Sequence, residues 1–510
     1  MNIYLEIERL LSYGQKKNMI TVWDRDYARN RLFQLFDLTG ETPPSLEIQE
    51  LGNLSTPGPI LERMLDYAAE KGLLEDNTIT DRDLFDPKIM DCLMPSPSQV
   101  IQTFYQTYEV NGPVAATNYF YQLSKDSEYI RTSRIAKNRH WFSETEFGEL
   151  EITINRSKPE KDPKAIAAAK ASSADYPKCL LCKENVGYAG RLDHPARDNH
   201  RIIPMDLAGE HWFLQYSPYV YYNEHAIVLS REHRPMEISK QGFERLLDLV
   251  QQLPHYCAGS NADLPIVGGS ILSHDHFQAG HHEFPMAKAE VHDEFIVKGF
   301  EDIKAGIVKW PMSVIRLQGK NQESLVKFGD LILNTWRNYN DESANIKSNS
   351  NGEAHNTITP IARRREAKFE LDLVLRNNRT SDEHPLGVFH PHEEVHHIKK
   401  ENIGLIEVMG LAVLPGRLID EMETISHYIR EGELHSAALE DEEAAKHVPW
   451  AKELVREHGS LSEEEAAHAI QQKIGRTFSK VLEHAGVFKR TEQGREAFLR
   501  FIKLVKEKGI

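Results

Sequence analysis

The stretch "GGSILSHDHFQAGHH", residues 268–282, constrains the fold of this chain more than any other segment. It places His274, His276 and Gln278 at alternate positions. Successive side chains of a β-strand point to opposite faces of its sheet. A strand in this segment would therefore present the two imidazoles and the amide together on one face.

The chemistry of these side chains points to phosphoryl transfer. An imidazole titrates near neutral pH and can act as a nucleophile, so one histidine can attack phosphorus while the other positions it or holds a metal. The neutral amide of Gln278 can donate a hydrogen bond to a phosphoryl oxygen. Gly269 and Ser270, just before the histidines, offer backbone N–H groups for a phosphate. The alternative is a pair of partly exposed histidines on a strand edge.

A Cys-x-x-Cys pair, Cys179 and Cys182 in "YPKCLLCKENVGYAG", predicts a metal site. Two thiolates at this spacing can hold one zinc ion from a tight turn. Zinc needs two further ligands, for which His233 and His274 are the candidates. The alternatives are a redox pair, which the flanking residues do not favour, or two small buried hydrophobic side chains.

The pattern of apolar residues predicts an α+β protein. Helical spacing runs to about residue 129, strand-like alternation begins near "ETEFGELEITINRS", and charged helical segments follow from about residue 415. Ser462 and Glu465 form the sequence pattern of a helix-capping box. A chain of 510 residues is too long for one ordinary core. We expect a helical extension over 1–135, a catalytic part over 136–300, a second part over 301–418 and a helical region over 419–510.

Composition excludes several classes of protein. The sequence contains no apolar run of about 18 residues, which argues against a membrane span, and its N-terminus does not resemble a signal peptide. Four cysteines are too few for a disulfide scaffold and fit a reducing cytoplasm. The formal net charge of −16 argues against nucleic-acid binding. An anionic substrate would need a local basic pocket.

These motifs together resemble the galactose-1-phosphate uridylyltransferase family of the histidine-triad superfamily. "SHDHFQ" is similar to the family's His-Pro-His-Gly-Gln core, "CLLC" to its zinc-binding pair, and "NEHAIVLSREH" to a hairpin that ends in a histidine. The helical N-terminal extension and "DHPARDNHRIIP" resemble the type-2 branch of Gram-positive bacteria. The resemblance implies two related halves built on antiparallel sheets, with helical extensions at both ends.

The resemblance also implies roles for individual residues. His276 corresponds to the nucleophile that takes UMP from UDP-glucose, and Gln278 to the residue that binds the phosphoryl oxygen. Structural zinc is implied at Cys179, Cys182, His233 and His274. Phosphate contacts are implied at Arg156, Lys158 and Lys161, for which an ordinary solvated basic run is the alternative.

The sequence departs from the family pattern at several positions. Asp275 replaces the proline between the histidines, and the gap from Ser270 to His274 is one residue longer than usual. The family's second metal, iron, is bound by a His-x-His strand, where this chain has Asp372 and Val374. We therefore expect no iron at that position. His390 and His392 in "FHPHEEVHH" are an alternative cluster for a second metal, although a solvated histidine-rich loop is the favoured interpretation.

The expected reaction exchanges UMP between UDP-glucose and galactose-1-phosphate through a covalent uridylyl-histidine, with glucose-1-phosphate and UDP-galactose as products. Rival interpretations are a diadenosine polyphosphate phosphorylase, a nucleotide hydrolase of the same superfamily, and a zinc-binding protein without catalytic activity. The resemblance leaves the oligomeric state open, with a homodimer as one arrangement that the family uses.

Overall fold

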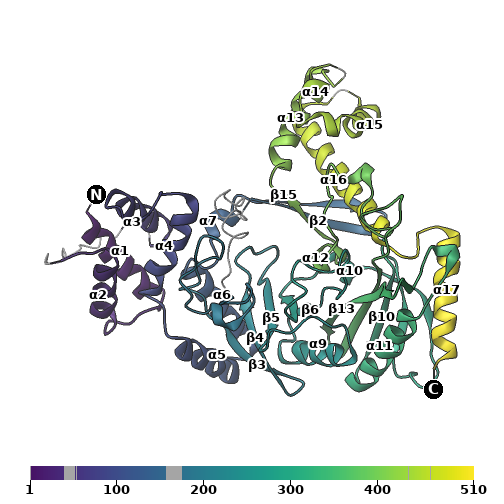
Figure 1. The fold of residues 1–510 in the computed structure, drawn as a ribbon, viewed down its shortest axis with the longest axis horizontal. Helices are drawn as coiled ribbons and strands as arrows, with labels where there is room; N and C mark the ends of the chain where they lie inside the picture. Colours follow the sequence, from purple (N-terminus) through teal and green to yellow (C-terminus); the bar gives the residue numbers. More distant parts are fainter. Residues whose placement is uncertain are drawn as a thin grey trace. The chain divides into compact units, whose positions relative to one another are not determined.

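The computed structural model describes residues 2–39, 52, 54–156, 175–434, 436–459 and 461–509 (Figure 1). It contains two compact units. The first comprises Met1–Ala136, Ser157–Val220 and Glu224–His233, and the second comprises Lys137–Arg156, Tyr221–Asn223 and Arg234–Ile510. The division of the chain into four parts, which the sequence suggested, stays a prediction.

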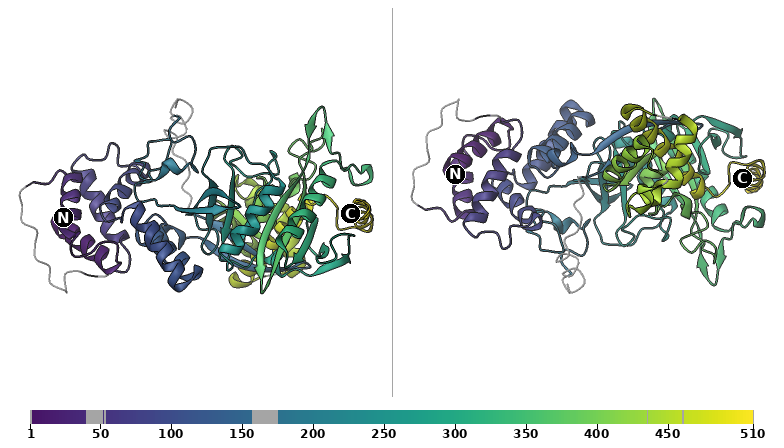
Figure 2. Two further views of the ribbon diagram at one scale, coloured as in Figure 1. Left: turned by 90° about the horizontal axis from the view of Figure 1, so that it is seen from below. Right: turned by 90° about the horizontal axis from the view of Figure 1, so that it is seen from above.

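The first unit begins with helices, as the sequence predicted. Its helices are α1 (Ile3–Lys16), α2 (Arg25–Leu35), α3 (Gly58–Glu70), α4 (Ile79–Asp91), α5 (Pro97–Asn111), α6 (Pro113–Asp126) and α7 (Thr132–Ile135). Helices α1 to α4 pack together, as all three views show (Figures 1 and 2). Asn2 caps α1, since its side-chain oxygen accepts a hydrogen bond from the Tyr4 N–H at 3.1 Å. Buried Glu8 of α1 pairs with Arg25 and Arg29, which joins α1 to α2.

The first unit contains three neighbouring strands, β3 (Ile203–Leu207), β4 (Glu210–Tyr216) and β5 (Ala226–Ser230), in the order β3-β4-β5. A larger group of strands lies in the second unit, in the order β7-β6-β13-β14-β10-β9-β8. Their bounds are β6 (Cys257–Gly259), β7 (His276–Gly280), β8 (Val291–Phe295), β9 (Lys304–Val308), β10 (Val314–Gly319), β13 (Asn356–Arg365) and β14 (Lys368–Asn377). The strand pairs within each group are antiparallel.

The second unit also contains two smaller sheets. One has the order β1-β2-β15, in which β1 (Arg139–Thr145) runs antiparallel to β2 (Gly148–Asn155), and β15 (Leu411–Pro415) runs parallel to β2. The other is the hairpin of β11 (Asn349–Ser350) and β12 (Glu353–Ala354).

Helices α9 (Lys240–Gln252) and α11 (Gln322–Arg337) pack against the central strands of the second unit (Figure 1). The buried indole of Trp336 in α11 donates a hydrogen bond to the Thr357 carbonyl of β13 at 2.9 Å, which fixes the helix on the sheet. The remaining helices of this unit are α10 (Pro285–Lys288), α12 (Leu405–Val408), α13 (Leu418–Glu431), α14 (Ala437–Glu440), α15 (Val448–His458), α16 (Glu463–Ala485) and α17 (Glu492–Glu507).

The long helix α16 starts at the capping box that the sequence predicted. The Ser462 hydroxyl accepts from the Glu465 N–H at 3.4 Å, and the Glu465 carboxylate accepts from the Ser462 N–H at 2.9 Å. Farther along, α16 lies against β1 so closely that a Cβ atom on Gly475 would be 2.1 Å from the Cβ of Ser143. The C-terminal helical region is therefore packed onto a sheet of the second unit.

The α+β fold class, the antiparallel main sheet and the helical ends are confirmed. In the segment "IGLIEVMGLAVL", the helix α12 precedes the strand β15. The Glu407 carboxylate accepts from the Gly404 N–H at 3.2 Å and favours the helical turn. Within the described part of the chain, no helix is long and apolar enough to span a membrane.

Candidate active site and metal centre

Strand β7 begins at His276, not at His274 as the alternating pattern suggested. Phe277 and Ala279 are 2% and 1% exposed, so the face opposite His276 and Gln278 packs into the interior. His274 precedes the strand, in irregular backbone. The predicted alternation therefore holds for His276 and Gln278, whereas His274 is positioned by the loop.

The His276 ring is held by a main-chain contact. Its Nδ1 lies 2.7 Å from the carbonyl oxygen of His274. Because a carbonyl can only accept, Nδ1 carries the proton and Nε2 keeps its lone pair. Burial lowers the pKa of His276 to about 4, although the hydrogen bond to the carbonyl acts in the opposite direction. His276 is therefore a neutral imidazole at pH 7, with the tautomer that a nucleophilic Nε2 requires.

Gln278 lies two residues farther along β7, opposite Gly259 of β6. Its Oε1 atom is buried and has no hydrogen-bond partner among the described residues. A buried amide normally has its polar atoms paired. Gln278 therefore has an unused hydrogen-bond acceptor on the strand that carries His276.

The glycines before the histidines are explained by close packing. A Cβ atom on Gly268 would lie 2.5 Å from the carbonyl oxygen of Ala262, and one on Gly269 would lie 2.7 Å from Nδ2 of Asn261. Buried Asn261 also accepts a hydrogen bond from the Leu405 N–H at 2.9 Å. Ser270 is exposed. Sequence reasoning overlooked Asn261, which supports this loop, and phosphate binding by Gly269 and Ser270 stays a prediction.

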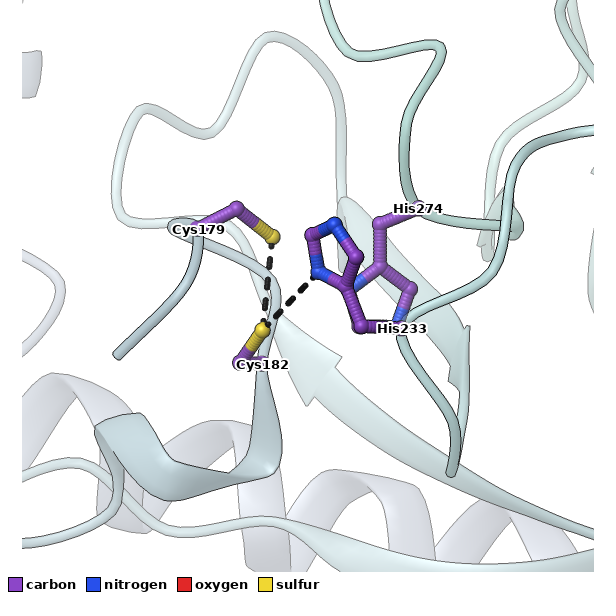
Figure 3. Close-up of side chains that lie close together, drawn as sticks. All are labelled: Cys179, Cys182, His233 and His274. Atoms are coloured by element: carbon purple, nitrogen blue, oxygen red, sulfur yellow. Dashed lines mark hydrogen bonds between the residues drawn. The ribbon is translucent and has the colours of Figure 1, made fainter. Parts of the chain in front are cut away.

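The four residues predicted to bind zinc lie together (Figure 3). One ligand atom from each of Cys179, Cys182, His233 and His274 lies within 4.8 Å of the others. The two sulfur atoms are 3.6 Å apart, and the Cys182 Sγ is 3.3 Å from Nδ1 of His233. This group could hold a metal ion.

The spacing of these atoms fits a tetrahedral ion with thiolate ligands. Zn–S bonds of about 2.3 Å in a tetrahedron place two sulfurs about 3.8 Å apart, close to the separation of Cys179 and Cys182. Burial raises the pKa of the Cys179 thiol. A bound cation acts in the opposite direction and favours the thiolate. The turn that positions the pair is fixed by Asn185, whose amide donates to the Cys182 carbonyl at 2.7 Å.

Three basic side chains were predicted to bind phosphate, and the structure describes one of them. Lys158 and Lys161 lie outside the described residues. Arg156 is exposed, and its Nη2 lies 2.6 Å from Oδ1 of Asp420. Arg156 is therefore already paired, and its contact with a phosphate stays a prediction.

The strand expected at the family's second metal site carries an ion-pair network. Asp372 of β14 is fully buried between Arg316 of β10 and Arg363 of β13. Glu370 lies beside it and also pairs with Arg363. Burial alone raises the pKa of Asp372, but the two guanidinium groups outweigh this effect and lower it. Val374 is buried and offers no ligand atom. Two guanidinium groups thus neutralise the carboxylate of Asp372. The absence of iron at this position stays a prediction.

The interpretation of His390 and His392 as a solvated loop was wrong. His390 is 4% exposed, and its Nε2 lies 3.1 Å from Oδ1 of Asn402. The His392 ring stacks between those of His384 and His484, at centroid distances of 4.1 and 4.4 Å. His484 belongs to α16, so a helix distant in sequence covers this segment.

Fold and site together define an α+β protein with a buried, tautomerically fixed histidine next to a Cys₂His₂ group. Two family models match it: galactose-1-phosphate uridyl transferase, N-terminal domain, over residues 18–235, and the C-terminal domain over residues 249–446. The chain belongs to the galactose-1-phosphate uridylyltransferase family.

Curated relatives share the full length of the chain. The galactose-1-phosphate uridylyltransferase of Halalkalibacterium halodurans is 56% identical over 502 residues, which cover 98% of each protein. That of Bacillus subtilis is 54% identical over 507 residues, again 98% of each. The crystal structure of yeast Ap4A phosphorylase matches with a TM-score of 0.31 and 12% identity, over 64% of this chain and 89% of that one.

Proposed function

We propose that this chain transfers UMP between UDP-glucose and galactose-1-phosphate through a covalent intermediate on His276. Membership of the family and relatives named galactose-1-phosphate uridylyltransferase support the reaction. The single observation that carries the mechanism is the 2.7 Å contact between Nδ1 of His276 and the His274 carbonyl. It leaves Nε2 as the nucleophilic atom.

In the first half-reaction, Nε2 of His276 attacks the α-phosphorus of UDP-glucose. A P–N bond forms, the bond from phosphorus to the bridging oxygen breaks, and glucose-1-phosphate leaves with the electron pair. In the second, a phosphate oxygen of galactose-1-phosphate attacks the same phosphorus and the P–N bond breaks. UDP-galactose leaves and the neutral imidazole returns. No proton has to reach the leaving group, because sugar phosphates leave as anions.

Gln278 has the role of a transition-state donor in this scheme. Its side chain lies on the strand of His276, two residues beyond the nucleophile. An amide N–H can bind the phosphoryl oxygen as its charge increases. Arg156, Lys158, Lys161, Gly269 and Ser270 complete the proposed set of phosphate contacts.

Zinc is the metal that we propose for Cys179, Cys182, His233 and His274. Two thiolates and two imidazoles form one of the usual ligand sets of structural zinc. A zinc ion with four protein ligands stabilises the fold around it and has no open position for substrate. Since His274 also supplies the carbonyl that orients His276, its side chain would anchor the backbone next to the nucleophile.

Labelling tests the proposal. Protein incubated with UDP-glucose that carries ³²P at the α-phosphate should acquire acid-labile label on the peptide that contains His276, and galactose-1-phosphate should release it as UDP-galactose. His276→Gly should acquire none, whereas the matched variant His281→Gly, five residues along the chain, should still be labelled. Label that persists in His276→Gly would show that the nucleophile is a different residue.

A further inference from the structure

A cleft of about 220 Å³ opens in the second unit, at the end of β7 that is remote from His276. His281 and His282, which follow the strand, line it together with Cys257 of β6 and the last three residues of β13. His276 and Gly280 are four residues apart, about 13 Å at 3.3 Å per residue of strand. Neither His276 nor Gln278 lines the cleft. It is therefore distinct from the candidate active site.

Three consecutive arginines, Arg363, Arg364 and Arg365, line one side of this cleft. Arg363 pairs with Glu370 and Asp372, and Arg365 pairs with Glu283 at 3.2 Å and with Glu370 at 3.4 Å. Arg316 also pairs with Asp372. Glu151, which accepts a hydrogen bond from His282 of the cleft wall at 2.7 Å, is a further carboxylate nearby, so the guanidinium groups and carboxylates around the cleft are equal in number.

Arg364 is the arginine of this set that has no carboxylate partner among the described residues. Its Nη1 donates to Oε1 of Gln251 at 3.1 Å, its Nη2 donates to the Glu366 carbonyl at 3.4 Å, and its guanidinium lies 4.1 Å from the centroid of the Phe369 ring. All of these partners are neutral, and no described carboxylate forms an ion pair with it. Stacking on Phe369 holds the planar group in place, so part of the cost of ordering this side chain is met before any ligand binds.

The size of the cleft limits the ligand. Pockets for drug-sized molecules measure about 300–1,000 Å³, so a cavity of about 220 Å³ is too small for a nucleotide and suits a compact ion. Guanidinium groups bind oxyanions through paired N–H donors. His255 and His281, whose rings meet edge to face at 5.2 Å, add imidazole groups to the wall.

We propose that this cleft is a second anion site, which binds a phosphate group through Arg364. The phosphate is either free or part of a hexose phosphate, and both share the tetrahedral oxyanion that the guanidinium recognises. Glu283 lies in the wall and repels an anion, but its pairing with Arg365 offsets that charge. The inference is independent of the uridylyl-transfer reaction, because it rests on groups that the reaction does not use.

Protection of Cys257 tests the site directly. This thiol lines the cleft, and burial raises its pKa to about 11, so a thiol reagent should modify it slowly. Inorganic phosphate should slow modification of Cys257 further in the full chain, measured on its peptide by mass spectrometry. Cys92, a buried thiol of the first unit, is the internal reference and should show no change.

Two variants separate the cleft from the rest of the protein. Arg364→Gln should weaken phosphate protection roughly tenfold or more, as expected for the loss of a charged donor. Arg430→Gln removes an arginine of α13 that pairs with Glu463, outside the cleft. Phosphate should protect Cys257 in this variant as strongly as in the unchanged chain. Glucose-1-phosphate is the second probe, and protection by it but not by free phosphate would assign the site to hexose phosphates. Equal protection in Arg364→Gln and the unchanged chain, or no protection by either probe, would overturn the proposal.

Discussion

Arg316 donates two hydrogen bonds to Asp372, from Nε to Oδ1 at 2.7 Å and from Nη2 to Oδ2 at 2.9 Å. Both side chains are buried, at 7% and 0% exposure, and Arg363 reaches the same carboxylate. Loss of one partner of a buried ion pair leaves an uncompensated charge, which is far more costly than loss of an exposed pair.

Asp372→Asn should therefore lower the free energy of unfolding of the second unit by about 3–5 kcal/mol. Urea denaturation followed by fluorescence measures this, since Trp310 and Trp336 are buried in that unit. The control is Asp420→Asn, whose exposed pair with Arg156 should contribute less than about 1 kcal/mol. Equal effects of the two substitutions would contradict the importance of burial.

Acid should weaken the second unit through Glu151. Burial raises the pKa of this carboxyl, but hydrogen bonds from His140 and His282, each 2.7 Å long, outweigh burial and lower it to about 2. The pKa of Glu151 in the folded protein lies below its ordinary value of 4.5. Its contribution to the free energy of unfolding is therefore present above about pH 4.5 and is lost as the pH falls from there toward 2. Glu151→Gln should remove up to about 3 kcal/mol of stability at pH 7 and flatten the decline below pH 4.5, in denaturation curves recorded at each pH. The control Glu144→Gln changes an exposed residue of β1. It should alter neither the stability at pH 7 nor its decline below about pH 4.5.

Gln278→Ala should slow both half-reactions by roughly ten- to a thousand-fold, as expected for the loss of one transition-state donor. Initial rates with UDP-glucose varied at several galactose-1-phosphate concentrations should give parallel lines for the unchanged chain, since the two substrates react in turn. Hydrolysis of UDP-glucose without acceptor should be slow. Intersecting lines would indicate a ternary complex, and rapid hydrolysis would indicate a hydrolase.

Removal of the metal should affect stability as well as activity. We expect about one zinc per chain by elemental analysis of protein purified without added metal. Cys179→Ser with Cys182→Ser should lose it and lower the unfolding temperature. The control Cys92→Ser, at a cysteine that does not belong to the group, should keep the metal. Unchanged zinc content in the double variant would place the ion elsewhere.

Gly475→Ala tests the contact of α16 with β1. In an exposed helix this substitution stabilises by about 1 kcal/mol. Here the added Cβ would lie 2.1 Å from that of Ser143, so the substitution should destabilise by about 1–3 kcal/mol. Gly242→Ala in α9 is the matched control, because its Cβ would have no neighbour closer than 3.8 Å, and it should be neutral or stabilising in the same denaturation assay.

Local sequence patterns predicted those features of the site that depend on residues close together in the sequence. Strand alternation placed His276 and Gln278 on one face, and the spacing of Cys179 and Cys182 predicted the metal group, because backbone geometry determines both. The start of β7 at His276 was not predictable, since strand pairing depends on β6. The ring stacking of His392 depends on His484 of α16, and the neutralisation of Asp372 depends on Arg316 of another strand. No local pattern encodes either contact.

The acceptor for Nδ1 of His276 belongs to the main chain. No side-chain substitution can delete a peptide carbonyl, so mutation at neighbouring positions can disturb the ring's orientation only by moving the backbone. In the proposed reaction, the same oxygen would also act on the charge of the covalent intermediate. An imidazole that carries phosphorus on Nε2 and a proton on Nδ1 is a cation, and the negative end of the carbonyl dipole faces that charge. One unmutable contact would thus set the resting tautomer and stabilise the loaded ring, so its removal would require chemical replacement of the amide itself.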